Sequence, residues 1–225
     1  MSDFDQDLFD FLEQYISEHK QSLCKEIIAE RTRFATIILE DIHKEHNASA
    51  VIRTADCLGI QDIHLIGNEY EVSKHISMGS FKWVNLIQYD KAKTGLKESI
   101  NQIKSQGYTV YATSPHSKSI SVEEIPITSK AAFLFGNELK GLSDEAMEYA
   151  DAHVRIPIHG FTESLNLSVS VAICLHSFLT KIKDSNIRWQ LSQKEQNKIV
   201  LGWYKAIIRN AEMIEAEYYK RNQAE

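Results

Sequence analysis

The middle of the chain alternates short apolar segments, rich in β-branched residues, with segments whose apolar residues have the spacing of helices. The apolar segments lie at 34–42, 60–67, 108–114, 130–136 and 152–158, and the helical patterns at 50–59, 93–107, 142–150 and 164–182. Strands that alternate with helices of this length are typical of βαβ units around a parallel sheet. The sequence therefore predicts an α/β fold in which helices cover both faces of a parallel sheet.

Helical segments without strands flank this alternating region. A chain of 225 residues is long enough for one main domain with extensions. We expect an N-terminal helical extension at 1–33, the main domain at 34–183 and a C-terminal helical extension at 184–225. No apolar run approaches the roughly 20 residues that span a bilayer, and the acidic N-terminus lacks the features of a secretory signal. We therefore expect a cytoplasmic protein with no membrane partner.

Charge is distributed unevenly along the chain. The net charge is −6, yet residues 181–225 contain nine Lys or Arg and six Asp or Glu, which leaves the rest at −9. A basic tail is compatible with an RNA partner, but solvated helix faces carry similar charges. Charge alone leaves both interpretations open.

The cysteine and histidine residues give little sign of redox or metal chemistry. Cys24, Cys57 and Cys174 lie far apart among apolar residues and have no CxxC spacing, so we expect buried, reduced thiols. His43 and His46 lack a second cluster of ligands nearby. We expect no metal site.

The segment 164–171 alternates small polar and aliphatic residues, which is the pattern of a strand, but it lies directly before a helical pattern. Pro157 and Gly160 end the preceding strand and favour a loop from Gly160 to Asn166. We therefore predict that a helix follows this loop, with Ser164 or Asn166 accepting backbone N–H groups in its first turn.

Three loops follow predicted strands and contain polar residues, and ligands of open parallel sheets bind at the carboxyl ends of strands. Asn47 opens a helix on which Arg53 lies between small residues, so its guanidinium has room to bind an anion, although a surface or salt-bridged arginine fits equally well. Glu138 lies in a glycine-flanked turn, where a carboxylate is also an ordinary turn residue. The third loop contains Ser164 and Asn166.

Two common nucleotide-binding motifs are absent from these loops. The spacing from Gly136 to Gly141 is that of a phosphate-binding loop, but Leu142 replaces the required lysine. No G-x-G-x-x-G pattern follows the first strand, which argues against a dinucleotide site.

Taken together, the segments "NASAVIRTADCLG", "FGNELKGLS" and "IPIHGFTESLNLSVSVA" resemble the three motifs of the SpoU class of SPOUT RNA methyltransferases. The resemblance covers about residues 34–180, and "SMGSFKWV" at 77–84 resembles the connecting segment of the family. It implies that the C-terminal part of the main domain forms a deep trefoil knot, an exception to the usual absence of knots. It also implies a homodimer whose active site borrows residues across the interface.

The resemblance further implies an activity, a cofactor and a set of site residues. The expected reaction is methyl transfer from S-adenosyl-L-methionine to a ribose 2′-hydroxyl of tRNA, at guanosine 18 in the D-loop. Arg53 would bind a phosphate beside the target ribose and, in the family pattern, assist deprotonation of the hydroxyl. The other implied residues are Asn47, Glu138, Ser164 and Asn166 for orientation and catalysis, and Thr113, Gly136, Ile156 and Leu165 for the cofactor. The alternatives are 2′-O-methylation of another RNA and a knotted RNA-binding protein without catalysis.

The C-terminal block combines basic residues with an apolar stripe. We expect Arg188, Lys205 and Arg209 to contact tRNA phosphates. The alternative is a brace for the dimer that depends on the apolar residues Ile199, Leu201, Trp203, Ile207 and Ile208. We favour a combination of both interpretations, in which the apolar stripe packs on the main domain and the basic residues face RNA.

Overall fold

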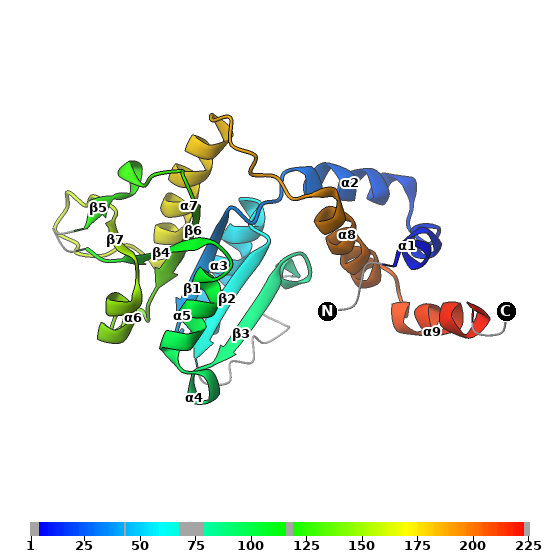
Figure 1. Ribbon diagram of the computed structural model, residues 1–225, viewed down its shortest axis with the longest axis horizontal. Helices are drawn as coiled ribbons and strands as arrows, with labels where there is room; N and C mark the ends of the chain where they lie inside the picture. Colours follow the sequence, from blue (N-terminus) through cyan, green and yellow to red (C-terminus); the bar gives the residue numbers. More distant parts are fainter. Residues whose placement is uncertain (1–4, 43, 68–78, 116–118, 223–225) are drawn as a thin grey trace. The chain divides into compact units, whose positions relative to one another are not determined.

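The computed structural model describes residues 5–42, 44–67, 79–115 and 119–222 (Figure 1). Its contacts divide the chain into a larger unit, Thr32–Trp189, and a smaller unit that joins Met1–Arg31 to Gln190–Glu225. His43 and the first part of the predicted connecting segment 77–84 lie outside the described residues.

Within the described residues of the larger unit, seven strands form one sheet in the order β3-β2-β1-β6-β4-β7-β5, and every pairing is parallel. The strands are β1 Ala35–Glu40, β2 Asp62–Gly67, β3 Asn85–Asp90, β4 Tyr108–Thr113, β5 Ile120–Ser121, β6 Lys130–Phe135 and β7 Ala152–Arg155. The predicted parallel sheet is therefore confirmed. The sequence did not predict β3 or the two-residue β5, because neither contains a long apolar run.

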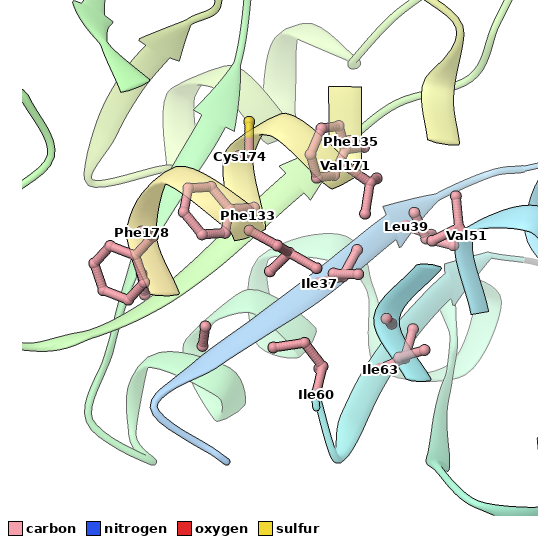
Figure 2. Close-up of a cluster of buried hydrophobic side chains, with 14 of the residues drawn as sticks. Ile37, Leu39, Val51, Ile60, Ile63, Phe133, Phe135, Val171, Cys174 and Phe178 are labelled. Atoms are coloured by element: carbon pink, nitrogen blue, oxygen red, sulfur yellow. The ribbon is translucent and has the colours of Figure 1, made fainter. Parts of the chain in front are cut away.

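Helices cover both faces of this sheet, as predicted. Those of the larger unit are α3 Glu45–Cys57, α4 Lys91–Thr94, α5 Leu96–Lys104, α6 Asp144–Tyr149 and α7 Leu167–Lys183, with short 3-10 turns at Ser80–Lys82 and Val122–Glu124. Alternate strand residues point to opposite faces, so Ile37 and Phe133 pack with α3 and α7, whereas Ile38 and Leu134 pack with α5 and α6. Figure 2 shows the first of these two layers, in which Phe178 of α7 meets Phe133 of β6.

Two details of α3 differ from the sequence prediction. The helix begins at Glu45 with Lys44 as its N-cap, so Asn47 lies in its first turn rather than at its start. Cys57 at its C-terminus is exposed, and the predicted burial of this thiol is wrong, whereas Cys24 and Cys174 are buried. The residues of α3 that face the sheet include Val51 and Ala55, and Cys57 projects from a different side of the helix.

The smaller unit consists of helices from both ends of the chain. Its helices are α1 Gln6–Glu13, α2 Glu18–Ala29, α8 Gln193–Ile207 and α9 Ala211–Asn222. Leu201 and Ile208 pack with Leu8 and Leu12 of α1 and with Tyr218 of α9. These two residues of the apolar stripe therefore pack within the smaller unit, on α1 and α9, whereas we predicted packing on the main domain. In the described part of the chain, the helices are too short or too polar to cross a bilayer.

Candidate active site at the carboxyl ends of the strands

A cavity of about 420 Å³ lies where β4, β6 and β7 end and α7 begins. Its lining contains all four residues predicted for the cofactor and four of the five predicted for catalysis, namely Thr113, Gly136, Ile156 and Leu165, and Asn47, Glu138, Ser164 and Asn166. The walls include apolar side chains of Phe135, Leu142, Val154, Ile158, Leu167 and Cys174. Three segments far apart in the sequence thus form one concave site with a few polar groups in a largely apolar wall, which is the usual character of a ligand site.

The loop after β6 folds back on itself at the edge of the cavity. The backbone N–H of Asn137 donates to the carbonyl of Gly141 at 3.0 Å, and that of Gly141 donates to the carbonyl of Asn137 at 2.8 Å. A Cβ atom on Gly136 would lie 2.2 Å from the carbonyl carbon and oxygen of Gly141, and Gly141 itself has φ of +72°. Glycine is required at both positions, because one has no space for a side chain and the other adopts a left-handed conformation.

Asn47 links the first predicted motif to this loop. Its side-chain Nδ2 donates a hydrogen bond of 2.5 Å to Oε1 of the half-buried Glu138. This hydrogen bond limits the orientations of the Glu138 side chain, which also lines the cavity.

The third motif is arranged as its sequence predicts. Asn166 is the N-cap of α7, and its Oδ1 accepts from the backbone N–H of Ser168 at 3.0 Å and from the hydroxyl of Ser168 at 2.8 Å. The expected cap is therefore confirmed at Asn166. Ser164 lines the cavity from the preceding loop and is exposed.

Two polar side chains in the wall have structural partners. Thr113 donates its hydroxyl to the carbonyl of Leu134 at 2.9 Å, which ties the end of β4 to β6. Burial raises the pKa of the Cys174 thiol to about 12, so this cysteine stays protonated near neutral pH and serves as an apolar wall residue.

Arg53 is the one predicted catalytic residue that is not part of the described cavity lining. It lies on α3 and is exposed, whereas its neighbours Val51 and Ile52 are fully buried against the sheet. The side chain of Arg53 is therefore at the surface of α3 and is not among the residues that line the cavity of its own chain.

The structure does not bring the three predicted RNA-binding residues together in one unit. Arg188 is exposed and belongs to the larger unit, whereas Lys205 and Arg209 belong to the smaller unit. Arg209 is exposed, but Nζ of Lys205 lies 2.6 Å from Oε1 of Glu215. The ammonium of Lys205 already has a counter-ion in the protein.

Sequence reasoning missed several residues of the cavity. Lys44, Asn137 and Glu163 line it, and each lies within two or three residues of a residue that the sequence singled out. These three residues could have been predicted from the sequence, because each is a polar residue close to a recognised motif. Among the described residues, no group of three His, Cys, Asp or Glu side chains has the arrangement of a metal site.

Comparisons with known proteins agree with this geometry. Residues 35–176 match the model of the SpoU rRNA Methylase family. The chain is 39% identical over 206 residues to a tRNA (guanosine(18)-2′-O)-methyltransferase of Borreliella burgdorferi, an alignment that covers 91% of this chain and 93% of the relative. It is 35% identical to a tRNA (guanosine(18)-2′-O)-methyltransferase of Thermus thermophilus, with 71% of this chain and 81% of the relative covered.

Solved structures show the same similarity. The TrmH/SpoU tRNA modifying enzyme of A. aeolicus superposes with a TM-score of 0.73 at 28% identity, covering 85% of this chain and 98% of that one. An AdoMet-bound rRNA methyltransferase from Sinorhizobium meliloti has a TM-score of 0.60 at 26% identity and covers 69% of this chain and 59% of its own. From the three motifs around one cavity and the family match over most of the chain, we conclude that this protein belongs to the SpoU rRNA methylase family.

Proposed function

We propose that the protein transfers a methyl group from S-adenosyl-L-methionine to a ribose 2′-hydroxyl of tRNA, at guanosine 18 in the D-loop, in the cytoplasm. The observation that carries this proposal is the convergence of the three motifs on one cavity in a chain that aligns over nine-tenths of its length with a tRNA (guanosine(18)-2′-O)-methyltransferase. Methylation of another RNA is the second candidate, because one structural relative is an rRNA methyltransferase.

The cavity fits the proposed cofactor. Its volume lies within the range of about 300–1,000 Å³ that is usual for small-molecule sites. Phe135, Ile156 and Leu165 offer apolar surface for an adenine ring, and Gly136 leaves the backbone of its loop open to close approach. S-adenosylmethionine would supply an electrophilic methyl group on its sulfonium sulfur. The sulfur would become a neutral thioether, and the ribose oxygen that takes the methyl group would release its proton to water.

The residues of the chain would position the RNA and its hydroxyl. Asn47 fixes Glu138, and Ser164 and Asn166 lie in the lining where a ribose would enter. A guanidinium is a poor base and a good partner for phosphate, so we assign Arg53 the binding of a phosphate beside the target ribose rather than the removal of the hydroxyl proton. Its planar guanidinium can bind two phosphate oxygens and fix the nucleotide in line with the methyl group.

The position of Arg53 supports a homodimer. Because Arg53 is exposed and lies outside the cavity of its own chain, a second copy would bring this side chain to the neighbouring cavity. Apolar side chains close in sequence to residues of the cavity lining are exposed, as a surface that binds another protein would be. They are Leu139, Phe161 and Val169.

Mixed dimers test this sharing of the site. Arg53→Ala and Glu138→Ala would each be inactive as homodimers. If Arg53 acts on the cavity of its partner, a heterodimer of the two variants contains one site with both residues intact, and a statistical mixture regains about a quarter of wild-type activity. A mixture that dimerises but stays inactive would contradict sharing, since Arg53 would then act within its own chain.

The contacts of α7 support the proposed trefoil knot. Nζ of Lys181 donates to the carbonyl of Glu123 at 2.9 Å and to that of Ile125 at 2.6 Å. Residues 123–125, which precede β6, therefore lie against one side of α7, while Phe178 on α7 packs against Phe133 of the sheet. A helix enclosed between a loop and the sheet is what threading of the C-terminal segment would produce.

Methylation of tRNA from radiolabelled S-adenosylmethionine tests the proposed function directly. The expected result is incorporation into bulk tRNA, with mass spectrometry locating 2′-O-methylguanosine at position 18. Methylation at another nucleotide, or only in rRNA, would replace the proposed substrate. Binding of tRNA without any methyl transfer would instead favour the non-catalytic RNA-binding alternative.

A further inference from the structure

Glu40 is a buried carboxylate directly beside the candidate active site. It is the last residue of β1 and is only 2% exposed. Its Oε2 accepts from the backbone N–H of Ser143 at 2.9 Å, and its Oε1 accepts from the Ser143 hydroxyl at 2.6 Å and from Nζ of Lys91 at 3.2 Å. A buried carboxylate is costly unless it is paired and hydrogen-bonded, and here both oxygens have partners.

The next residue, Asp41, contacts the beginning of the loop 136–143, which ends at Ser143. Its carbonyl accepts from Nδ2 of Asn137 at 2.9 Å, and its Oδ2 lies 2.7 Å from Nζ of Lys91. Asp41 has φ of +47°, a left-handed conformation that is uncommon for a residue other than glycine. Lys91 thus pairs with two consecutive carboxylates, while the Glu40 carboxylate anchors the loop at Ser143 and the Asp41 carbonyl anchors it at Asn137.

The loop held in this way, residues 136–143, forms one wall of the cavity. Gly136, Asn137, Glu138, Gly141 and Leu142 all belong to the cavity lining. The hydroxyl of Ser143 also caps α6 by accepting from the backbone N–H of Ala146 at 3.1 Å. The position of this wall therefore depends on where Glu40 holds Ser143.

We propose that Glu40 is a positioning residue for cofactor binding, which acts through Ser143, with Lys91 as its counter-ion, to hold loop 136–143 in the conformation that receives S-adenosylmethionine. The proposal rests on the proposed function for the identity of the ligand. It differs from a general contribution to stability, because the side chain contacts the cofactor loop itself and not only the sheet.

Asp62 provides a matched control for this distinction. It is also a buried carboxylate at a strand end, 7% exposed, and it accepts from Nε of Arg33 at 2.7 Å and from Nδ2 of Asn85 at 2.7 Å. It begins β2, so it lies at the amino ends of the strands, away from the cavity. Glu40→Gln and Asp62→Asn each remove one buried negative charge and keep the size of the side chain.

Calorimetric titration with S-adenosylhomocysteine compares the two variants. We expect Glu40→Gln to raise the dissociation constant at least about tenfold, the scale of a lost hydrogen bond to a charged group, and to raise KM for S-adenosylmethionine with kcat within about threefold. Asp62→Asn should lower Tm but leave the dissociation constant within about twofold. Equal effects of the two variants on cofactor affinity would overturn the assignment.

The hydrogen-exchange rates of the backbone amides 137–143, measured in the absence of cofactor, test whether Glu40 positions the loop. Faster exchange in Glu40→Gln and unchanged exchange in Asp62→Asn are expected, and equal protection in wild type and Glu40→Gln would contradict the proposal. Failure of the wild-type protein to bind S-adenosylmethionine would remove the proposed function, whereas the exchange result would still decide the role of Glu40.

Ser143→Ala tests whether Glu40 acts on cofactor binding through Ser143. It also replaces Glu40→Gln as the test variant if Glu40→Gln does not fold. It should weaken cofactor binding in the same direction by a smaller factor, because the backbone hydrogen bond to Glu40 remains. If both variants fold, their effects on cofactor affinity should be less than additive in the double variant, and full additivity would show that Glu40 does not act through Ser143.

Discussion

Lowering the pH from 7.5 to 5 should destabilise the larger unit by about 2 kcal/mol through His64. His64 lies on β2 and is fully buried, with Nδ1 3.1 Å from the hydroxyl of Tyr89. Among the described residues, its Nε2 has no hydrogen-bond partner. Burial lowers the pKa of His64 from 6.5 to about 4, and the nearby Asp62 opposes this shift only in part.

The sign and size follow from linkage. The unfolded chain binds a proton at His64 with a pKa near 6.5, whereas the folded protein resists protonation until the pH approaches 4. Acidification therefore stabilises the unfolded state, and stability falls by up to about 1.4 kcal/mol per pH unit between these two values. The loss is absent above pH 6.5 and complete below about pH 4.

Urea unfolding at several pH values, followed by circular dichroism, measures this loss. His64→Phe keeps an aromatic side chain in the core but cannot titrate, so its stability between pH 7.5 and 5 should vary about 2 kcal/mol less than that of the wild type. Other titrating groups are common to both proteins and cancel in the comparison. An identical pH dependence in the two proteins would refute the reasoning.

Three further predictions concern function. Arg53→Ala should lower the methylation rate at least about 100-fold in a single-turnover assay and leave cofactor affinity unchanged, because the proposed contact with RNA is lost while the cavity lining keeps all its residues. Gly136→Ala should weaken S-adenosylhomocysteine binding in calorimetry, because the added Cβ would lie 2.2 Å from backbone atoms of its own loop. Neutralising Arg188 and Arg209 should weaken tRNA binding and flatten its salt dependence in filter-binding assays, whereas Lys205→Ala should change the slope less, because Glu215 already pairs with this lysine.

The central strands could be predicted from the sequence because each contains a run of apolar residues, at 37–39 in β1 and at 131–135 in β6. All six residues of β1 are buried, and so are five of the six in β6. A strand buried on both faces has consecutive apolar residues, whereas a half-exposed strand alternates apolar and polar ones. In β3 the single buried residue is Tyr89, and the mixed sequence "NLIQYD" contains no such run. The order of the strands depends on crossovers that pair residues such as Ile37 with Phe133, and no local pattern encodes that pairing.

The site could be predicted as far as its residues lie in the motifs. Asn47, Glu138 and Asn166 follow strands of a parallel sheet, and the geometry of such sheets brings these positions together. Glu40 was missed although the sequence "TIILED" places an acid at the end of an apolar run, which is an unusual position for an unpaired charge. Its partner Ser143 lies 103 residues later, and only the folded structure identifies it.

The association of the two chain ends constrains how RNA can be bound. The smaller unit contains nine Lys or Arg and thirteen Asp or Glu, so it is acidic as a whole although the C-terminal block is basic. A net negative body gives RNA no long-range attraction, and charges beyond about 8 Å are screened at physiological ionic strength. Binding by this unit must therefore depend on single cations that touch phosphates, and the exposed Arg209 meets this condition better than the paired Lys205. A few local contacts favour an RNA whose folded shape matches their spacing over unstructured strands, which is consistent with tRNA as the proposed substrate.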